Sequence, residues 1–138
     1  MTALADIIAA HCAREGCLLP ILHGVQAAFG HVSEDAIREV AHALNLTRAE
    51  VHGVVSFYHD FRTEPDPRPT IRICRAEACK ARGIEALMPA IEEAAGDRVR
   101  VETVYCLGLC PVGPAALVGS TVHARLTREV AAALVQTL

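Results

Sequence analysis

The chain has 138 residues, enough for one ordinary hydrophobic core or for a small domain with a helical extension. Its formal net charge of −3 gives no electrostatic reason to expect nucleic-acid binding. No apolar run approaches membrane-spanning length and the N-terminal stretch does not resemble a signal peptide, so we expect a cytoplasmic protein without direct membrane insertion. Thiols stay reduced there, which favours metal or cluster ligation over disulfides for the six cysteines.

Four short helices are predicted in the first sixty residues. Their ranges are 3–14, about 18 to 30, from Ser33 onward, and 48 to about 58. Ser33 is suited to the N-cap of the third helix, and Thr47 and Glu50 form a capping box before the fourth. Each helix has one apolar face, so the helices must pack on one another or on something else.

A proline-rich segment follows at residues 63–69, with three prolines in five residues. Prolines at this density cannot continue a helix and favour a stiff, extended link. We interpret the segment as a linker between a helical docking region, 1–62, and a cluster domain, 70–138. A surface loop inside a single domain is the alternative.

The second half alternates strands and helices. Strands are predicted at 70–74 and 99–104, a hairpin at 115–118 and 121–125, and helices at 80–95 and 128–137. Pro89 is expected to kink or restart the first of these helices, and Thr127 to cap the second. Gly119-Ser120 suits a type II′ turn. The order is β-α-β, then a hairpin, then a helix, which gives an α/β fold with four strands.

Four cysteines have the spacing C-x4-C, 26 residues, then C-x3-C: Cys74, Cys79, Cys106 and Cys110. Thiolates are soft ligands, and sets of four bind an iron–sulfur cluster or zinc. Structural zinc usually uses tighter C-x2-C pairs, so the spacing favours a 2Fe–2S cluster, with zinc and free thiols as alternatives. Each pair follows a predicted strand, where a rigid sheet holds loops that can surround a cofactor.

Three stretches together resemble the thioredoxin-like 2Fe–2S ferredoxin family: Cys106-Leu-Gly-Leu-Cys110-Pro, the upstream C-x4-C, and VHGVVSFYHDF at 51–61. The resemblance runs from about residue 18 to the C-terminus. It implies a thioredoxin-like, four-stranded mixed sheet after an N-terminal helical bundle. It also implies one 2Fe–2S cluster on the four cysteines, with FMN and NAD only on a partner subunit.

Known members of this family are subunits of NAD-linked complexes. They include the small subunit of NADH:quinone oxidoreductase (complex I), the diaphorase subunits of NAD-linked hydrogenases and the gamma subunit of NAD-dependent formate dehydrogenase. The loop Cys74-Arg-Ala-Glu-Ala-Cys79, followed by Lys80, looks most like the formate dehydrogenase member. This implies a non-catalytic electron-transfer subunit whose partners are an FMN/NAD-binding flavoprotein and a molybdenum-containing catalytic subunit.

Two other classes compete with an electron carrier. A zinc-stabilised interaction module would use the same four cysteines without redox chemistry. A thiol–disulfide enzyme is disfavoured because the chain has no C-x-x-C motif.

Several other residues invite a functional interpretation. Cys12 and Cys17 form a second C-x4-C, but on a continued helix they would point in different directions, so we interpret them as small apolar residues. The seven histidines are scattered without metal-ligand spacing. Cations near the first cysteine pair would favour a reduced cluster, or they belong to a solvated or docking surface; they are Arg75, Lys80 and Arg82. Apolar residues expected to shield a cluster are Leu107, Leu109, Pro111 and Val112.

Overall fold

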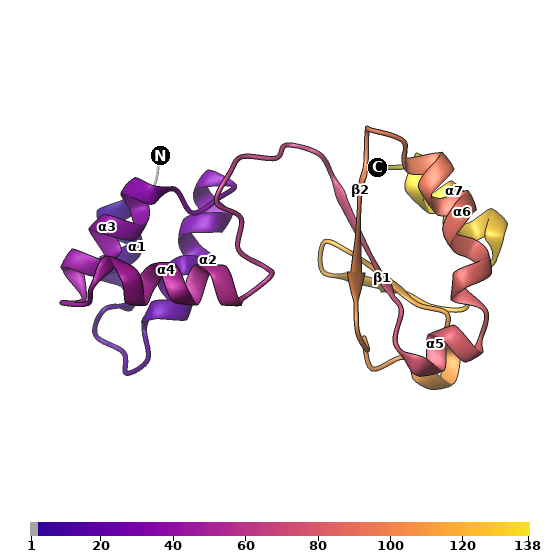
Figure 1. The fold of residues 1–138 in the computed structure, drawn as a ribbon, viewed down its shortest axis with the longest axis horizontal. Coiled ribbons are helices and arrows are strands. Elements are labelled where there is room, and N and C mark those ends of the chain that lie inside the picture. The colour runs from indigo at the N-terminus through magenta and orange to yellow at the C-terminus, as the bar shows by residue number, and fades with distance from the viewer. Residues whose placement is uncertain (1–2) are drawn as a thin grey trace. The chain divides into compact units, whose positions relative to one another are not determined.

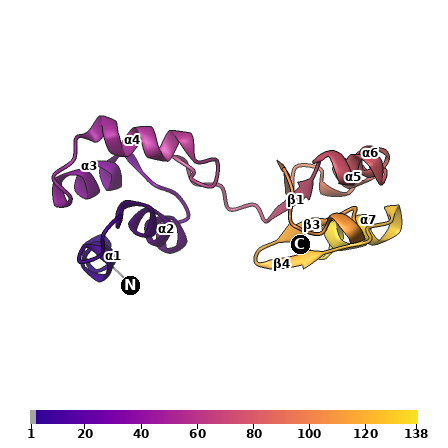
Figure 2. The same cartoon turned by 90° about the horizontal axis from the view of Figure 1, so that it is seen from below.

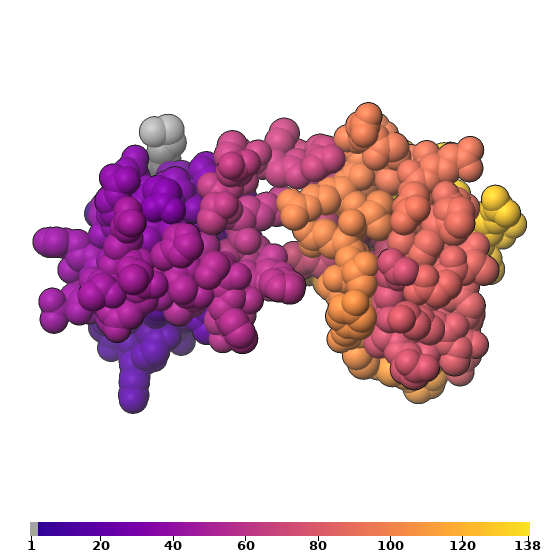
Figure 3. Space-filling model, viewed as in Figure 1, coloured from indigo at the N-terminus to yellow at the C-terminus, as the bar shows by residue number. Residues whose placement is uncertain are grey.

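The computed structural model describes residues 3–138 and divides the chain into two compact units, one up to Pro67 and one from Arg68 (Figure 1). Each unit has its own cluster of buried apolar side chains. Within each unit the side chains fill the space between the ribbons on the face that Figure 3 shows. In the described part of the chain, no helix combines the length and apolarity needed to cross a membrane.

The first unit consists of four helices: α1 (Leu4–His11), α2 (Leu18–Phe29), α3 (Glu34–Ala43) and α4 (Arg48–Phe57) (Figure 2). Their apolar faces meet in one core whose fully buried members are Ile21, Leu22, Val25, Val32, Ile37, Val40 and Val51. Of the two alternatives that the sequence leaves open, packing on one another or on something else, the structure shows that the helices pack on one another. The first helix is shorter than predicted, because the chain turns after His11 and passes through a left-handed Gly16 before α2.

The predicted caps are present in the helical unit. Ser33 Oγ accepts a hydrogen bond from the Ala36 N–H at 3.2 Å. Thr47 Oγ1 accepts one from the Glu50 N–H at 3.2 Å, and Glu50 Oε2 accepts one from the Thr47 N–H at 2.7 Å. These bonds satisfy N–H groups that the first turn of a helix leaves without partners.

The segment after α4 is fastened back onto the helical unit. The Arg62 N–H donates to Gln26 Oε1 at 2.6 Å, and the Val32 N–H donates to the Arg62 carbonyl at 2.7 Å. Gln26 Nε2 also donates to the Asp60 carbonyl. The chain is thus held against α2 as far as Arg62, directly before the proline-rich segment.

The second unit is built on a four-stranded mixed sheet. Its strands are β1 (Thr70–Cys74), β2 (Arg100–Val104), β3 (Ala116–Val118) and β4 (Thr121–His123), in the order β2-β1-β3-β4. The first two are parallel and the other pairings antiparallel. Gly119 has a φ of 58°, whereas Ser120 is not among the residues with positive φ, as a type II′ turn requires. The predicted α/β fold is confirmed.

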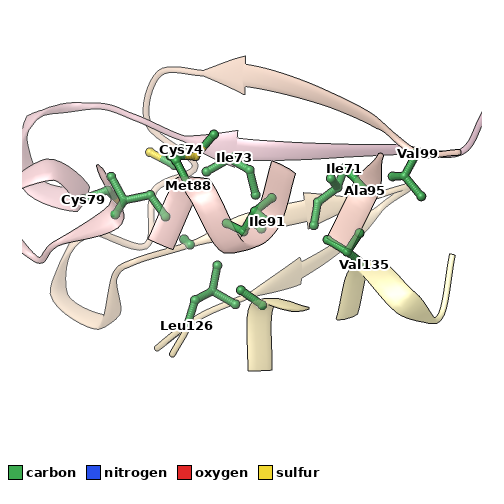
Figure 4. Packing of buried hydrophobic residues seen from close by; sticks show 14 residues of the cluster. Ile71, Ile73, Cys74, Cys79, Met88, Ile91, Ala95, Val99, Leu126 and Val135 are labelled. Carbon is green, nitrogen blue, oxygen red and sulfur yellow. The ribbon is translucent and has the colours of Figure 1, made fainter. Parts of the chain in front are cut away.

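Helices α6 (Ile84–Ala95) and α7 (Arg128–Gln136) lie on the same side of β1 and β2 in Figure 1. The core between helices and sheet contains Ile71, Ile73, Ile91 and Val135, all fully buried. Figure 4 shows Cys74 and Cys79 at one end of this cluster, opposite Val99 and Val135. Thr127 caps α7 as predicted, accepting a hydrogen bond from the Val130 N–H at 3.3 Å.

The helix predicted at 80–95 is two helices, and its break does not lie at Pro89. A short helix, α5 (Glu77–Ala81), ends before Gly83, which has a φ of 91° and precedes α6. This left-handed conformation is cheap only for glycine, so it separates the two helices. Helix α6 continues through Pro89 to Ala95. Of the two expectations for Pro89, a restart of the helix is therefore wrong, and a kink stays a prediction.

Candidate functional site

Two loops at one edge of the sheet present the four cysteines. Cys74 is the last residue of β1 and pairs in register with Val104, the last residue of β2. Because β1 and β2 are parallel neighbours, their carboxyl ends meet at the same edge. Cys79 follows in α5, and Cys106 and Cys110 follow β2, the latter opening a short 3-10 turn, Cys110–Val112. The topology thus brings together two pairs that are 26 residues apart in sequence.

The two pairs differ in burial. Cys74 and Cys79 are each 2% exposed and belong to the hydrophobic core, whereas Cys110 is half-buried and Cys106 exposed. All four are free thiols. The Cys106 and Cys110 Sγ atoms lie 3.6 Å apart. Two thiolates on one tetrahedral metal with bonds of about 2.3 Å lie about 3.8 Å apart, so this pair needs little movement to hold an iron.

Hydrogen bonds act on the Cys74 sulfur. Burial raises the pKa of this thiol, but hydrogen bonds outweigh burial and the pKa is lowered overall. The donors are the backbone N–H of Ala76, the Cys79 thiol, and the backbone N–H groups of Cys106 and Leu107. Donors from both loops therefore converge on one sulfur, and such hydrogen bonds stabilise a thiolate ligand and help set the potential of a cluster.

The other thiols are linked to this group electrostatically. Burial, followed by the hydrogen bond to Cys74, raises the pKa of Cys79, and nearby Cys110 contributes to the same effect. The hydrogen bond with Cys106 raises the pKa of Cys110. Four thiolates this close would repel one another, and bound cationic metal would remove that repulsion. The residues therefore fit a four-thiolate metal centre arranged as two pairs.

Two glycines near the cysteines are explained by different constraints. Gly108 lies in the second loop, and a Cβ there would meet nothing within 4 Å. Its φ of 76° shows that the loop needs glycine for its backbone conformation. Close approach occurs at Gly113, where a Cβ would lie 3.2 Å from Cys79 Sγ. Sequence reasoning missed Gly113; its position three residues after Cys110 was the available signal.

The residues that flank the four cysteines differ in burial and in their contacts. Leu107 and Leu109 pack against the core, whereas Pro111 is exposed. Arg75 forms an ion pair with Glu85, while Lys80 and Arg82 are exposed. Among residues 3–138, no group of three or more His, Cys, Asp or Glu side chains is placed to hold a single metal ion. This finding includes the four cysteines.

Cys12 and Cys17 belong to the helical unit, whereas the four cysteines of the candidate site belong to the second unit. They do not lie on one continued helix. Cys12 follows the end of α1 and Cys17 precedes α2. Both border one open pocket together with Leu18 and Leu44; Cys12 is exposed and Cys17 half-buried.

A four-stranded mixed sheet with four thiols in the loops that follow its two parallel strands defines an α/β protein with a candidate four-thiolate metal centre. The chain belongs to the thioredoxin-like [2Fe-2S] ferredoxin family, whose model matches residues 4–138. The cofactor that this family implies is one 2Fe–2S cluster, which supplies one-electron transfer.

Similar proteins are subunits of larger redox complexes. The NADP-reducing hydrogenase subunit HndA of Solidesulfovibrio fructosivorans is 32% identical over 83% of this chain and 72% of its own length. An NADH-quinone oxidoreductase subunit of Rhizobium meliloti is 32% identical over 82% of this chain and 73% of its own. A crystal structure of an NAD+-reducing [NiFe]-hydrogenase matches with a TM-score of 0.70 and 27% identity, over 84% of this chain but only 21% of that chain.

Proposed function

We propose that Cys74, Cys79, Cys106 and Cys110 ligate one 2Fe–2S cluster, and that the chain exchanges single electrons with the FMN of a partner flavoprotein subunit. The observation that carries the proposal is the convergence of four free thiols, two from each strand-end loop, at one edge of the sheet. A 2Fe–2S cluster accepts or gives one electron, which suits a partner flavin that reacts with NAD in two-electron steps.

This chain's own residues would hold and shield the cluster. Cys74 and Cys79 anchor it in the hydrophobic core, where water has little access. Backbone N–H groups of both loops stabilise negative charge on the Cys74 sulfur. Cys106 is exposed and would place one side of the cluster at the surface, where an electron can pass to a partner.

Metal analysis tests the cluster. The purified chain is expected to contain two irons and two sulfides, to absorb visible light, and to give one EPR signal when reduced. Zinc as the sole stoichiometric metal, in a colourless protein, would instead support the zinc-stabilised interaction module.

We propose that residues 1–62 dock the chain onto the flavoprotein, that 63–69 act as a linker, and that 70–138 carry the cluster. The separate compact units before and after Pro67 support this division. The helical unit also exposes aromatic side chains: Phe57 is 75% exposed, Phe29 46% and Tyr58 44%. Exposed aromatic residues of this size are typical of protein interfaces.

For the parent complex we propose an NAD-dependent formate dehydrogenase. The support is the resemblance of the loop Cys74-Arg-Ala-Glu-Ala-Cys79, with Lys80, to its gamma subunit. Electrons from formate, released at a molybdenum centre on another subunit, would reach NAD⁺ through clusters and FMN. The relatives described above belong to a hydrogenase and to an NADH-quinone oxidoreductase, so these complexes are the competing assignments.

Isolation of the native complex decides between these assignments. The proteins that co-purify with this chain should include a molybdopterin subunit, and the complex should reduce NAD⁺ with formate. Co-purification of quinone-reducing membrane subunits, or of a nickel–iron hydrogenase, would reject formate dehydrogenase and leave the cluster assignment intact.

A further inference from the structure

Arg75 and Glu85 form a two-pronged ion pair beside the cysteine site. Arg75 Nε donates to Glu85 Oε1 at 2.9 Å, and a terminal nitrogen of the same guanidinium donates to Glu85 Oε2 at 2.6 Å. Two parallel hydrogen bonds fix the relative orientation of the two side chains, which a single contact does not. The pair is therefore a defined geometric link.

This link joins three elements around one cysteine. Arg75 directly follows Cys74 at the end of β1, and its backbone N–H donates to the Val104 carbonyl at the end of β2, at 2.9 Å. Glu85 lies in the first turn of α6. The side chain of Arg75 thus connects the sheet edge to α6, while its backbone connects the two strand ends.

The ion pair also closes a loop that carries a second cysteine. Residues 75 and 85 are the two ends of the segment that contains α5, and Cys79 lies in α5. The Ala76 N–H, one of the donors to the Cys74 sulfur, lies in the same segment. A bond between the ends of this segment restricts the positions that Cys79 and the Ala76 N–H can take relative to Cys74.

We propose that the Arg75–Glu85 ion pair is a clamp that positions the loop of Cys74 and Cys79 for the cluster, so that both side chains are positioning residues for cluster retention. This inference rests on the proposed function of the four cysteines. It also reassigns Arg75: its charge faces a carboxylate and is not a free cation that tunes the cluster.

A clamp differs from an ordinary stabilising ion pair. Both side chains are partly exposed, 34% for Arg75 and 45% for Glu85, and exposed pairs contribute little to the stability of a fold. The loss of the pair should therefore leave the unfolding temperature of the metal-free chain almost unchanged. It should instead alter how firmly the loop retains iron.

The test uses the full chain with a reconstituted cluster and an iron chelator that bleaches its visible absorbance. Arg75→Gln and Glu85→Gln should each lose the cluster about tenfold faster than the unchanged chain, the usual lower range for residues that support metal ligands. Arg75→Lys should also lose it faster, because an ammonium cannot form both parallel bonds. Arg38→Gln, which breaks the more exposed Arg38–Asp35 pair in the helical unit, should retain the cluster like the unchanged chain.

Each result has one meaning. Equal bleaching rates for all variants, wild-type behaviour of Arg75→Lys, or a fall in the metal-free unfolding temperature that parallels the faster bleaching would each overturn the clamp. A chain with both residues exchanged, Arg75→Glu and Glu85→Arg, should bleach more slowly than a chain with either of these two substitutions alone. That result would support the clamp. Failure of the unchanged chain to assemble a 2Fe–2S cluster would instead reject the proposed function.

Discussion

A Cβ on Gly24 would lie only 2.8 Å from Cγ2 of Ile7, so α2 packs against α1 at a distance that excludes a larger residue without adjustment. Ile7 is branched at Cβ, so its Cγ2 moves only if the whole side chain changes rotamer. Gly24 lies inside α2, where glycine is intrinsically unfavourable. The contact with Ile7 gives a reason for glycine at this position.

Gly24→Ala therefore sets two effects against each other. Alanine gains about 1 kcal/mol of helix propensity, whereas overpacking costs about 1–3 kcal/mol. We expect net destabilisation of up to about 2 kcal/mol in chemical unfolding followed by circular dichroism. In an Ile7→Ala background the clash is absent, so Gly24→Ala should stabilise by about 1 kcal/mol. The same sign in both backgrounds would contradict this account.

The capping box at the start of α4 predicts a pH effect. Hydrogen bonds from the Thr47 backbone and then its side chain lower the pKa of Glu50 in the folded chain. The unfolded chain then binds more protons in this range, so stability rises with pH. The contribution of Glu50 is complete above its unfolded pKa and is lost as the pH falls through the lower, folded pKa.

Unfolding temperatures of the wild-type chain and of Glu50→Gln, measured from neutral pH down to about pH 3, check this effect. We expect the wild-type chain to be more stable at neutral pH and the difference to shrink on acidification. Thr47→Ala removes both the hydroxyl of the cap and its bond to Glu50, so Glu50→Gln should have less effect in that background. A difference that grows toward low pH would exclude the proposed linkage.

Local signals were enough to predict most of the elements. Ser33, Thr47 and Thr127 cap helices as expected, because an N-cap depends on a side chain and an N–H group only two or three residues later. The restart expected at Pro89 was misplaced because proline is a strong local signal, whereas the left-handed conformation of Gly83 depends on how the chain turns between α5 and α6.

For the site, the cysteine spacing indicated the two strand-end loops but not how deeply each cysteine is buried. Burial of Cys79 and exposure of Cys106 follow from tertiary packing, since the loop that contains the buried Cys79 has the charged residues and the loop that contains the exposed Cys106 has the leucines. The approach of Gly113 to Cys79 joins residues 34 positions apart in the sequence, and only the fold brings them together. Local patterns contain no information about such a contact.

Gly113 supplies the third prediction. Its φ of −63° suits any residue, so the reason for glycine is space: a Cβ would lie 3.2 Å from Cys79 Sγ and 3.3 Å from Arg82 Cδ. The Arg82 side chain can move, but a sulfur held by iron cannot. We expect the iron content after reconstitution to fall in the order wild type, Gly113→Ala, Gly113→Val. Full iron content in Gly113→Val would show that the sulfur has room to shift.

The fourth prediction concerns docking. Phe57→Ala removes an aromatic side chain that is 75% exposed, so it should change fold stability by less than about 0.5 kcal/mol and leave the cluster in place. If this residue anchors the flavoprotein, affinity should fall about tenfold or more. Val130→Ala, at a 51% exposed position of the other unit, serves as the control and should bind normally.

A truncated chain that begins near Pro65 extends the same test. It should keep its cluster, since all four candidate ligands follow that residue, but should bind the flavoprotein poorly. Unchanged affinity in both the truncated chain and Phe57→Ala would reject docking through the helical unit.

The last prediction separates the two C-x4-C pairs, which have the same spacing but different surroundings. Cys74 ends a strand beside the second cysteine loop, whereas Cys12 and Cys17 lie in a turn of the helical unit that brings no further cysteine to them. Cys74→Ser should therefore abolish or strongly alter the EPR signal of the reduced chain, because an alkoxide or hydroxyl replaces a soft thiolate. Cys12→Ser and Cys17→Ser should leave both the signal and the iron content unchanged. Loss of the signal in either of these two variants would show that spacing alone, and not position at the sheet edge, determines which cysteines bind iron.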